Sequence, residues 1–505
     1  MRPWSLLAVF LALAAAAAAG PVRQGQWQED AVRDFTRRVA PAGAGADPYN
    51  CQPFNFTQRV DHFDRKNMRT FQQRYYLCDA LWRNRGPGSR EPLFVYFGGE
   101  AALDGAFASV FTDQAQAEGG LLLFIEHRYY GKSYPFGPKA SYTNEGLRYL
   151  TVEQAMADFH AITLAVRKAY NVPRSAKNVG YGGSYSGNVA AYMRLRYPHT
   201  FHAVLASSSV VKFLFGTEAW ERNKYFSAIS IGNSIAEVGG ARCKQAVAAA
   251  FGALQGPLWR TKDGRAQLAT AASLCPGFTL DSWDAVEGLS NFFEGTWWGA
   301  FQSLFSGGPD DNPVAQFCSN LAYFPNTPLG VLSAVSNFTR SQDLNNAACI
   351  DRQDAQKAYG VDYPRPDIED DMLPYTYQGC LQGFPTSALL WSAPPSIFGR
   401  YSMPPHRFAA WCKRVFGIQR PLQPPRGLLF NQWDYLAAGN IIFSSGGVDP
   451  WRPGNVLQTL GDTVPALTSA GASHCMDLDA ANSNTLASVN ATQALIKAYI
   501  RKWVY

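Results

Sequence analysis

The segment from Tyr181 to Gly187, Tyr-Gly-Gly-Ser-Tyr-Ser-Gly, is the sequence feature that most constrains the fold. A strand-like run, residues 178–182, leads into it, and a helix-like run, residues 188–195, leads out of it. A serine between small residues at a strand-to-helix junction is typical of a nucleophile elbow, a tight turn that lifts one hydroxyl above a sheet at a helix N-terminus. The segment therefore predicts an α/β architecture with Ser184 at the turn.

Two serines compete for this position. The strict G-x-S-x-G pattern would place glycine at position 186, whereas this chain has Ser186 followed by Gly187. Ser184 has Gly182 two residues before it and a small residue two residues after it, so the turn is sterically allowed. Ser186 is flanked by Ser184 and Asn188, which suits the turn less well. Because glycine-serine loops are often plain turns, the assignment depends on the rest of the chain.

The composition favours a large globular protein. The 505 residues are 47% hydrophobic and 14% aromatic, enough for two or three domains or for one large domain with an insertion. Lys+Arg 45 against Asp+Glu 39 gives a net charge of +6, spread without long basic runs. This charge pattern argues against nucleic acid as a partner.

The N-terminus has the form of a secretory signal peptide. Arg2 precedes an apolar-to-small run from Trp4 to Ala19, and Gly20 follows, so residues 1–20 are predicted to be cleaved. The run is shorter than the roughly 20 residues that a membrane span needs, and no later stretch is long enough, so no span is expected. The predicted location is the secretory pathway, ending in the lysosome or vacuole or outside the cell. Three sequons are candidate glycosylation sites: Asn55, Asn337 and Asn490.

Alternating strand and helix patterns indicate a parallel sheet. Apolar runs at residues 93–97, 121–125 and 203–206 read as buried strands, and Thr151 with Gln154 forms a capping box at the start of a helix. The sheet pattern resumes at residues 440–443 and 464–468, and a helix is expected at residues 492–503. Such alternation predicts βαβ units.

The alternation is interrupted by a long segment of different character. Residues 211–425 contain helix-like stretches, many Trp and Phe residues, proline-rich breaks and six of the nine cysteines. We interpret this segment as an inserted, mostly helical cap held by disulfides, which secretory entry permits. The predicted organisation is a signal peptide (1–20), an N-terminal arm or pro-segment (21–50), a first sheet part (51–210), the cap (211–425) and a second sheet part (426–505).

The partners that a nucleophilic serine needs follow in the expected order. The serine hydroxyl needs an imidazole to take its proton, and the imidazole needs a carboxylate to fix its tautomer. In α/β-hydrolases the order along the chain is Ser, then Asp or Glu, then His. Asp449 follows the strand at 440–443, and His474 follows the strand at 464–468, whereas Asp477 comes after the histidine. The sequence thus predicts an α/β-hydrolase fold with the triad Ser184, Asp449 and His474.

An oxyanion hole and the absence of a cofactor complete the prediction. One oxyanion donor should be the backbone N–H of Tyr185, and the second should be Gly98 or Gly99, in the loop after the first internal strand. The alternative for these glycines is plain turn formation. No C-x-x-C or H-E-x-x-H motif is present, so neither a metal site nor a cofactor is expected.

Several motifs together resemble one peptidase family. They are Gly-Gly-Ser-Tyr-Ser-Gly around Ser184, residues 126–131 with Pro-Phe-Gly at 135–137, Asp-Pro-Trp at 449–451 and Asp-His-Phe at 61–63. From about Phe54 to the C-terminus the chain is similar to the family of lysosomal prolyl carboxypeptidase, dipeptidyl peptidase II and thymus-specific serine protease. The resemblance implies an α/β-hydrolase with a helical, disulfide-bearing cap that cleaves peptides beside proline or alanine near one end.

The resemblance also bears on the cysteines. It suggests the pairs Cys243–Cys318, Cys275–Cys349 and Cys380–Cys412, and we add Cys51–Cys78 as a prediction of our own. Cys475 then remains unpaired beside His474, where the carboxypeptidase and dipeptidyl-peptidase branches of the family usually carry a second histidine. A free thiol there would either make the enzyme sensitive to thiol reagents or be buried and inert.

Three residues bear on substrate binding. Asn188 stands where those two branches commonly have a methionine that lines the proline pocket, which weakens the case for strict proline preference. Trp451 offers an indole face to a flat pyrrolidine ring. Glu100 could hold a free substrate amine, or it could be a loop carboxylate bonded to the backbone.

Three functions are compatible with these features. The leading prediction is a serine exopeptidase that acts on peptides through an acyl-enzyme, of the Pro-X carboxypeptidase or the dipeptidyl-peptidase type. An esterase or lipase would use the same triad, and a non-catalytic binding protein would retain the fold without the activity. A homodimer is left open by the sequence.

Overall fold

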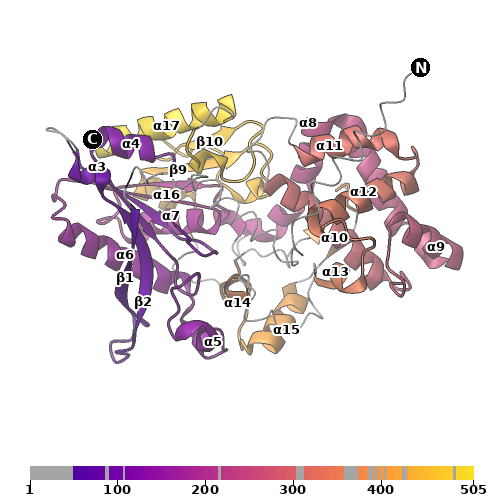
Figure 1. The fold of residues 1–505 in the computed structure, drawn as a ribbon, viewed down its shortest axis with the longest axis horizontal. Helices are drawn as coiled ribbons and strands as arrows, with labels where there is room; N and C mark the ends of the chain where they lie inside the picture. The colour runs from indigo at the N-terminus through magenta and orange to yellow at the C-terminus, as the bar shows by residue number, and fades with distance from the viewer. Residues whose placement is uncertain are drawn as a thin grey trace, which may run out of the picture.

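The computed structural model describes residue 49 and residues 51–85, 90–105, 109–213, 218–302, 312–357, 373–384, 391–392, 396–399, 401–402, 405–423, 428, 430–481 and 485–505. The predicted signal peptide and nearly all of the predicted N-terminal arm lie outside these residues. In the described part, a sheet with its helices forms one half of the molecule, and a mostly helical insertion forms the other (Figure 1).

The sheet is mixed and has eight strands in the order β1-β2-β4-β3-β5-β6-β9-β10. The pairs β1–β2 and β2–β4 are antiparallel, and the remaining neighbours are parallel. This is the α/β-hydrolase arrangement that the sequence predicted. The strands are β1 (Cys51–Arg59), β2 (Thr70–Cys78), β3 (Leu93–Phe97), β4 (Leu121–Ile125), β5 (Asn178–Gly183), β6 (Ala203–Ser207), β9 (Ile441–Gly446) and β10 (Ala466–Ser469).

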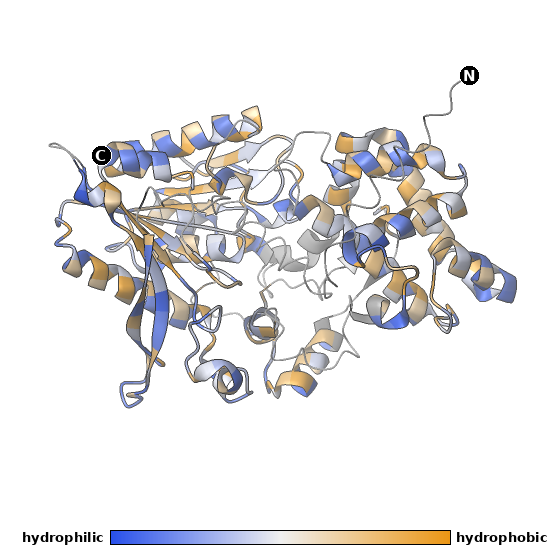
Figure 2. Cartoon of the chain, viewed as in Figure 1, coloured by the Kyte–Doolittle hydropathy of each residue, from blue (hydrophilic) through white to orange (hydrophobic). Residues whose placement is uncertain are grey.

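Side chains of the central strands alternate between two apolar cores, because successive residues of a strand point to opposite faces. In β3, Leu93, Val95 and Phe97 join one core, while Phe94 and Tyr96 join the other. Every residue of this strand is buried, which explains its continuous apolar run. Figure 2 shows the same distribution as hydrophobic strands between helices that are hydrophobic along one side.

Helices cover both faces of the sheet. Helices α6 and α7 pack on the core that contains Phe97, and α4 and α17 pack on the core that contains Phe94 (Figure 1). Their bounds are α4 (Thr112–Glu118), α6 (Val152–Ala169), α7 (Tyr185–Arg196) and α17 (Ala487–Val504). The shorter helices of this half are α3 (Ala80–Arg83), α5 (Gly137–Ser141), η1 (Gly146–Tyr149), η8 (Arg452–Gly454) and η9 (Met476–Leu478).

The capping box predicted at the start of α6 is only half formed. The Thr151 hydroxyl accepts the N–H of Gln154 as expected. The Gln154 side chain, however, accepts the N–H of His62 at 2.9 Å and donates to Asp61 at 2.7 Å. It therefore ties the loop after β1 to the helix instead of returning to the N-cap residue.

The insertion lies between β6 and β9. It contains η2 (Val211–Phe213), α8 (Glu218–Gln255), η3 (Pro257–Arg260), α9 (Lys262–Ala271), α10 (Trp283–Gln302), α11 (Pro313–Asn320), η5 (Leu321–Tyr323), α12 (Pro328–Asp343), α13 (Arg352–Lys357), α14 (Leu373–Gln382), α15 (Pro405–Phe416) and the short pair β7 (Trp391–Ser392) and β8 (Tyr401–Ser402). Helix α16 (Gln432–Ala438) follows it, and its Tyr435 packs on Phe443 of β9. Helix α8 is kinked at Gly240, whose φ is 82°. Residues 245–254 belong to the part of α8 after this kink, within the segment that the sequence predicted to be mostly helical.

Disulfides hold the insertion together and close the edge hairpin. Cys243–Cys318 joins α8 to α11, Cys380–Cys412 joins α14 to α15, and Cys275–Cys349 links two loops. Cys51–Cys78 joins the ends of β1 and β2. These are the four pairs that the sequence predicted, and Cys475 is free and buried.

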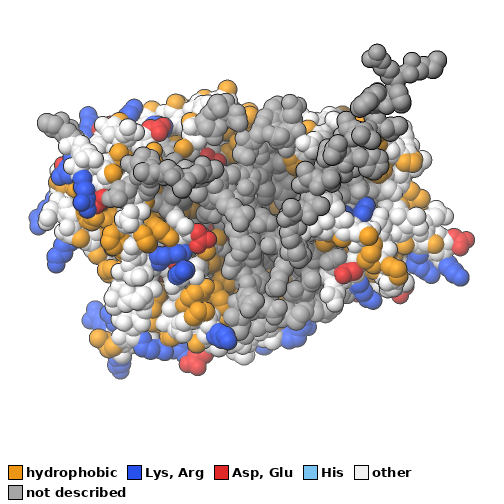
Figure 3. All heavy atoms as spheres, in the orientation of Figure 1, with side chains coloured by type: hydrophobic (Ala, Val, Ile, Leu, Met, Phe, Trp, Pro, Cys, Tyr) orange, Lys and Arg blue, Asp and Glu red, His pale blue; other side chains and the backbone are white. Residues whose placement is uncertain are grey.

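The surface of the described residues carries charges of both signs, interspersed on the face shown in Figure 3. The three sequon asparagines, Asn55, Asn337 and Asn490, are all exposed. Among the described residues, no helix combines the length and apolar character needed to cross a membrane.

Candidate active site

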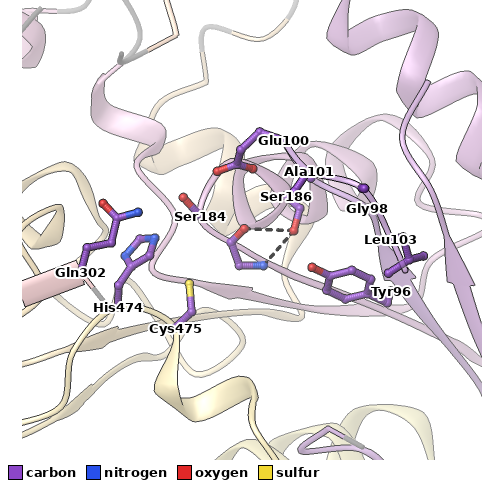
Figure 4. A pocket seen from close by; sticks show the side chains of 13 residues that line it. Tyr96, Gly98, Glu100, Ala101, Leu103, Ser184, Ser186, Gln302, His474 and Cys475 are labelled. Carbon is purple, nitrogen blue, oxygen red and sulfur yellow. Dashed lines mark hydrogen bonds between the residues drawn. The ribbon is translucent and has the colours of Figure 1, made fainter. Parts of the chain in front are cut away.

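The serine of the elbow occupies a strained turn at the junction of β5 and α7. Ser184 has φ 57° and ψ −128°, a conformation that a residue with a side chain rarely adopts. Its N–H donates to the carbonyl of Ser207 on the neighbouring strand β6 at 3.0 Å. The turn thus places the Ser184 side chain at the N-terminal end of α7, in a cavity at the carboxyl edge of the sheet (Figure 4).

The glycines around Ser184 are needed for close packing. A Cβ on Gly182 would lie 2.4 Å from the Ser186 carbonyl oxygen, and one on Gly183 would lie 2.7 Å from the sulfur of Cys475. A Cβ on Gly187 would lie 2.6 Å from the Ser207 carbonyl oxygen. The steric argument made from the sequence therefore extends to Gly187, which allows α7 to approach β6.

The rival serine is bound within the turn. The Ser186 hydroxyl accepts the N–H of Gly183 at 2.9 Å and donates to the Gly183 carbonyl at 3.0 Å, as drawn in Figure 4. Ser186 is also almost fully buried. These contacts explain how serine replaces glycine at this position, and they favour Ser184 over Ser186 as the reactive residue.

His474 and Asp449 meet at the ends of β10 and β9. The Nδ1 atom of His474 lies 3.0 Å from both carboxylate oxygens of Asp449. Asp449 is fully buried, and it also accepts the N–H of Trp451 at 2.8 Å. Because Asp449 accepts from Nδ1, this nitrogen carries the proton and Nε2 is the basic atom of the neutral ring.

The Nε2 atom of His474 is directed into the cavity that Ser184 also lines (Figure 4). It is buried and has no hydrogen-bond partner. Burial alone would lower the pKa of His474, but the adjacent Asp449 carboxylate, with a smaller contribution from Cys475, raises it well above its usual range. The arrangement thus combines a serine, an imidazole with a free nitrogen and a buried carboxylate at one site.

Glu100 occupies the other side of the cavity. It lines the same cavity as Ser184 and His474. Burial raises the pKa of this carboxyl group, and nearby hydrogen-bond donors and the positive charge of His474 act in the opposite direction. Both roles considered for Glu100, binding of a substrate amine and bonding to the backbone, stay predictions.

Of the two glycines predicted as the second oxyanion donor, Gly98 already has a partner for its N–H. The N–H of Gly98 donates to the Ile125 carbonyl at 2.8 Å, so it is not free to stabilise an oxyanion, contrary to one of the two assignments. A Cβ on Gly98 would lie 2.5 Å from that same oxygen, so glycine is needed there for close contact with β4. Gly99, the other candidate, lines the cavity, and its role as a donor stays a prediction.

Asn188 and Trp451, the other two residues predicted to bind substrate, lie outside the lining of the cavity. Neither Asn188 nor Trp451 is among the described residues that line this cavity. Trp451 packs edge-to-face on Trp298 of α10 with 4.6 Å between ring centroids, and its indole N–H donates to Gln302 at 2.8 Å. Asn188 is fully buried, and both polar atoms of its amide lack a hydrogen-bond partner.

One network at the site was not found from the sequence. The Tyr185 hydroxyl accepts from the Gln378 amide of α14 at 2.8 Å and lies 3.1 Å from Nε2 of His127. Because Nδ1 of His127 donates to the Arg128 carbonyl, Nε2 must accept the tyrosine proton. Burial lowers the pKa of His127 to about 4, which keeps this ring neutral. These hydrogen bonds hold Tyr185, the residue after Ser184, to helix α14 of the insertion.

No sequence pattern marks this network. Gln378 is separated from Tyr185 by 193 positions, and only the fold brings the two together. Among the described residues, no cluster of three or more His, Cys, Asp or Glu side chains could hold a metal ion.

The family of the chain follows from a comparison with known families. Residues 58–496 match the family described as serine carboxypeptidase S28. The chain belongs to this family. The match includes the elbow, the insertion and the loops that carry Asp449 and His474, so the protein is a serine peptidase of the S28 family.

Named relatives extend over most of the chain. Lysosomal Pro-X carboxypeptidase of Bos taurus is 28% identical over 466 residues, which cover 88% of this chain and 87% of the relative. Thymus-specific serine protease of Mus musculus is 27% identical over 470 residues, which cover 88% and 86%. This S28 chain is therefore similar to the Pro-X carboxypeptidase and to the thymus-specific serine protease along nearly its whole length.

Likeness to solved structures is more remote. Proline iminopeptidase of Mycobacterium smegmatis aligns with a TM-score of 0.37 and 11% identity, covering 89% of this chain and 99% of that one. At this level the likeness carries no argument about activity. The assignment to the S28 family depends on the sequence match.

Proposed function

We propose that this S28 peptidase is an exopeptidase that cleaves peptides beside proline or alanine near one terminus, with Ser184, His474 and Asp449 as its catalytic triad. The observation that carries the proposal is the convergence of three features. Ser184 lies on a strained elbow, Nε2 of His474 lacks a partner in the same cavity, and Nδ1 of His474 is bound to Asp449.

The chemistry follows from these roles. Nε2 of His474 takes the proton of the Ser184 hydroxyl while the oxygen attacks the scissile carbonyl carbon. The imidazolium then gives that proton to the leaving amine, which departs and leaves an acyl-enzyme. Water, deprotonated by the same nitrogen, attacks the ester and releases the acid product and Ser184. Asp449 holds the Nδ1 proton and stabilises the imidazolium throughout.

The negative charge on the tetrahedral intermediate needs two donors. We assign these to the backbone N–H of Tyr185, directly after Ser184, and to that of Gly99, which lines the same cavity. Neither donor depends on its side chain. The hydrogen bonds of the Tyr185 side chain to His127 and Gln378 hold one of these groups in place.

The substrate class is supported by the relatives. A relative named Pro-X carboxypeptidase acts, by its name, on a bond that follows proline. Trp451 lies two residues after Asp449. We therefore place its indole in the wall of the proline-binding pocket, together with Asn188. Both residues would lie behind the side chains that line the described cavity. The unpartnered amide of Asn188 would tolerate a small polar side chain, so we expect a relaxed proline preference.

We also propose that the protein acts in the secretory pathway, in the lysosome or outside the cell. Four disulfides, three exposed sequons and relatives named lysosomal support this location. Disulfides persist in oxidising compartments and are rare in the cytosol. Loss of the protein's glycans after treatment with an endoglycosidase, seen as a mass shift, would test entry into this pathway.

The function is tested with two proline peptides and the full-length protein. One peptide has a free N-terminus and a blocked C-terminus, and the other has the reverse. Cleavage of only the first identifies a dipeptidyl-peptidase type, and cleavage of only the second identifies a Pro-X carboxypeptidase type. The Ser184→Ala variant should cleave neither, and Ser186→Ala is the matched control that should retain activity.

Two outcomes would contradict the proposal. If both peptides stay intact while a simple ester is hydrolysed by the wild type and not by Ser184→Ala, the protein is an esterase on the same triad. If Ser186→Ala abolishes activity and Ser184→Ala does not, the nucleophile has been assigned to the wrong serine.

A further inference from the structure

Gln302 is the one residue of the insertion among the described residues that line the cavity at Ser184. It lies at the C-terminal end of helix α10, whereas the other lining residues belong to β3 and the loop after it, to the elbow, and to the loop after β10. Figure 4 shows its side chain directed toward Ser184 from the same side as His474. Of the described part of the insertion, this side chain is therefore what a peptide bound at Ser184 would meet.

The indole of Trp451 fixes the orientation of the Gln302 amide. The indole N–H of Trp451 donates to Oε1 of Gln302 at 2.8 Å. Because an indole nitrogen can only donate, its partner must be the amide oxygen, which leaves the two N–H donors on Nε2 for another acceptor. Figure 4 shows the nitrogen of this amide on the side of Ser184. Within the described part of the chain, Trp451 is the only hydrogen-bond partner of the Gln302 side chain.

Two contacts hold α10 against the loop that carries Asp449. Trp298, one helical turn before Gln302, packs edge-to-face on Trp451 with 4.6 Å between ring centroids. The backbone N–H of Trp451 in turn donates to Asp449 at 2.8 Å. Residues four apart on a helix lie on one face, so Trp298 and Gln302 contact the same indole. A donor that is already held in place loses little conformational entropy when it binds a substrate.

A bound peptide needs donors for more than its reacting carbonyl. It brings several carbonyl oxygens to the site, and each favours a hydrogen bond once water is excluded. No Lys or Arg is among the described residues that line the cavity. Tyr96, Ser186 and Cys475 line it but are buried, and the serine and histidine of the triad take part in the chemistry. The half-buried Gln302 is therefore the described side chain that can offer N–H donors to a second substrate oxygen.

We propose that Gln302 is a substrate-binding residue, whose amide nitrogen donates to a carbonyl or carboxylate oxygen of the bound peptide other than the one under attack. This contact from the insertion sets the register of the peptide against Ser184. The inference rests on the proposed function in taking Ser184 as the nucleophile. It follows that Gln302 contributes to the cleavage of peptides and not to the hydrolysis of an ester that has a single carbonyl.

The test compares two reactions of Ser184 in the full-length protein. One is cleavage of whichever proline peptide the wild type cuts, and the other is hydrolysis of 4-nitrophenyl acetate, whose only carbonyl is the reacting one. Gln302→Met is close to glutamine in shape and removes the amide. We expect it to lower kcat/KM for the peptide about 10-fold and to leave kcat/KM for the ester within about 3-fold of wild type. Activity on the ester also shows that the variant is folded.

Gln302→Glu isolates the contribution of the N–H donors, because it keeps an oxygen for Trp451 and replaces Nε2 with a second oxygen. It should lower kcat/KM for the peptide at least as much as Gln302→Met does. Gln267→Glu, the same change at an exposed position of α9, is the matched control and should follow the wild type on both substrates. Equal losses for a peptide and for its C-terminal amide identify a backbone carbonyl as the acceptor, and a loss confined to the free acid identifies the terminal carboxylate.

Three results would overturn the inference. The first is an unchanged kcat/KM for the peptide in Gln302→Met, and the second is a loss of equal size on the peptide and the ester. The third is full activity of Gln302→Glu on the peptide, which would mean that the N–H donors are not used. If the wild type cuts neither peptide, the exopeptidase assignment itself fails, and the inference fails with it.

Discussion

Two buried aspartates, one in each half of the molecule, have opposite surroundings. In the sheet half, Asp158 is bound by Arg128 at 2.6 Å and 2.7 Å and by His62 at 2.8 Å, with Asp158 and Arg128 fully buried. In the insertion, Asp343 accepts one hydroxyl, that of Thr296, at 2.7 Å, and its other oxygen has no partner. A paired carboxylate is stable as an ion, whereas an isolated one is stable only when protonated.

The insertion contains a second acid of this kind. Burial raises the pKa of Glu294 on α10 to about 8, and burial raises the pKa of Asp343 well above its usual range. An acid with a raised pKa holds its proton in the folded state at a pH where the unfolded chain has released it, so stability falls as the pH rises. The comparison therefore predicts that Glu294 and Asp343 destabilise the insertion as the pH rises, whereas the pair of Asp158 and Arg128 needs an ionised carboxylate.

Replacement of Asp449 should have the largest effect on activity, because Asp449 binds His474, the residue that transfers protons in the proposed mechanism. Replacing Asp449 with Asn should lower kcat about 10⁴-fold, since the amide favours the wrong tautomer of His474. Asp477, in the same loop region as His474, accepts the hydroxyls of Ser207 and Ser444 at 2.6 Å each, and its replacement by Asn should cost less than about 10-fold. Steady-state kinetics on the cleaved peptide measure both, and equal losses would mean that Asp449 is not the acid of the triad.

Replacement of the two buried aspartates, Asp158 and Asp343, should change the free energy of unfolding in opposite directions at pH 8. Asp158→Asn leaves Arg128 buried without its counter-ion and should lower the free energy of unfolding by about 3–5 kcal/mol. Asp343→Asn removes an acid that is unstable as an ion and should raise stability at pH 8, with little change near pH 4. Urea unfolding with intact disulfides, followed by tryptophan fluorescence at both pH values, measures this. Loss of stability in Asp343→Asn at pH 8 would contradict the comparison.

Glu294 gives a smaller effect, with a pH range that can be stated. Because burial raises its pKa to about 8 from 4.5, its destabilising effect is absent below pH 4.5, grows as the pH rises and is complete above pH 8. Glu294→Gln should raise the free energy of unfolding by about 1–4 kcal/mol at pH 8 and leave it unchanged at pH 4. Melting temperatures of this variant and of the surface control Glu145→Gln test it. A shift of equal size at both pH values would mean that Glu294 does not titrate in this range.

The sequence predicted the parts of the fold that leave a continuous local pattern. Strand β3 is buried along its whole length, so its apolar run was visible, as was that of β4. The hairpin of β1 and β2 was missed, because most residues of β1 are exposed and no regular alternation marks them. A periodic pattern of apolar residues indicates which residues are buried, and an edge strand buries few residues.

The site was predictable where chemistry depends on residue type. Ser184, Asp449 and His474 were predicted from their order along the chain; Ser184 and His474 line one cavity, and Asp449 is bound to His474 behind it. Gly98 was one of two candidate oxyanion donors, and the bond of its N–H to the Ile125 carbonyl depends on the contact between β3 and β4, which no residue type records. Gln378 reaches Tyr185 from the insertion, and its position depends on tertiary packing that no local signal records.

Cys475 should show the smallest effect, although it lies beside the proposed base. Burial raises the pKa of its thiol, against the opposing influence of His474, so the reactive thiolate is scarce at neutral pH. It is also only 5% exposed, which limits the access of a reagent to its sulfur at the edge of the cavity. Iodoacetamide should therefore leave the native enzyme active, and Cys475→Ala should change kcat/KM less than about 3-fold. Rapid loss of activity in the wild type but not in Cys475→Ala would instead identify an accessible thiol, and would mean that this edge of the cavity opens more than its buried contacts indicate.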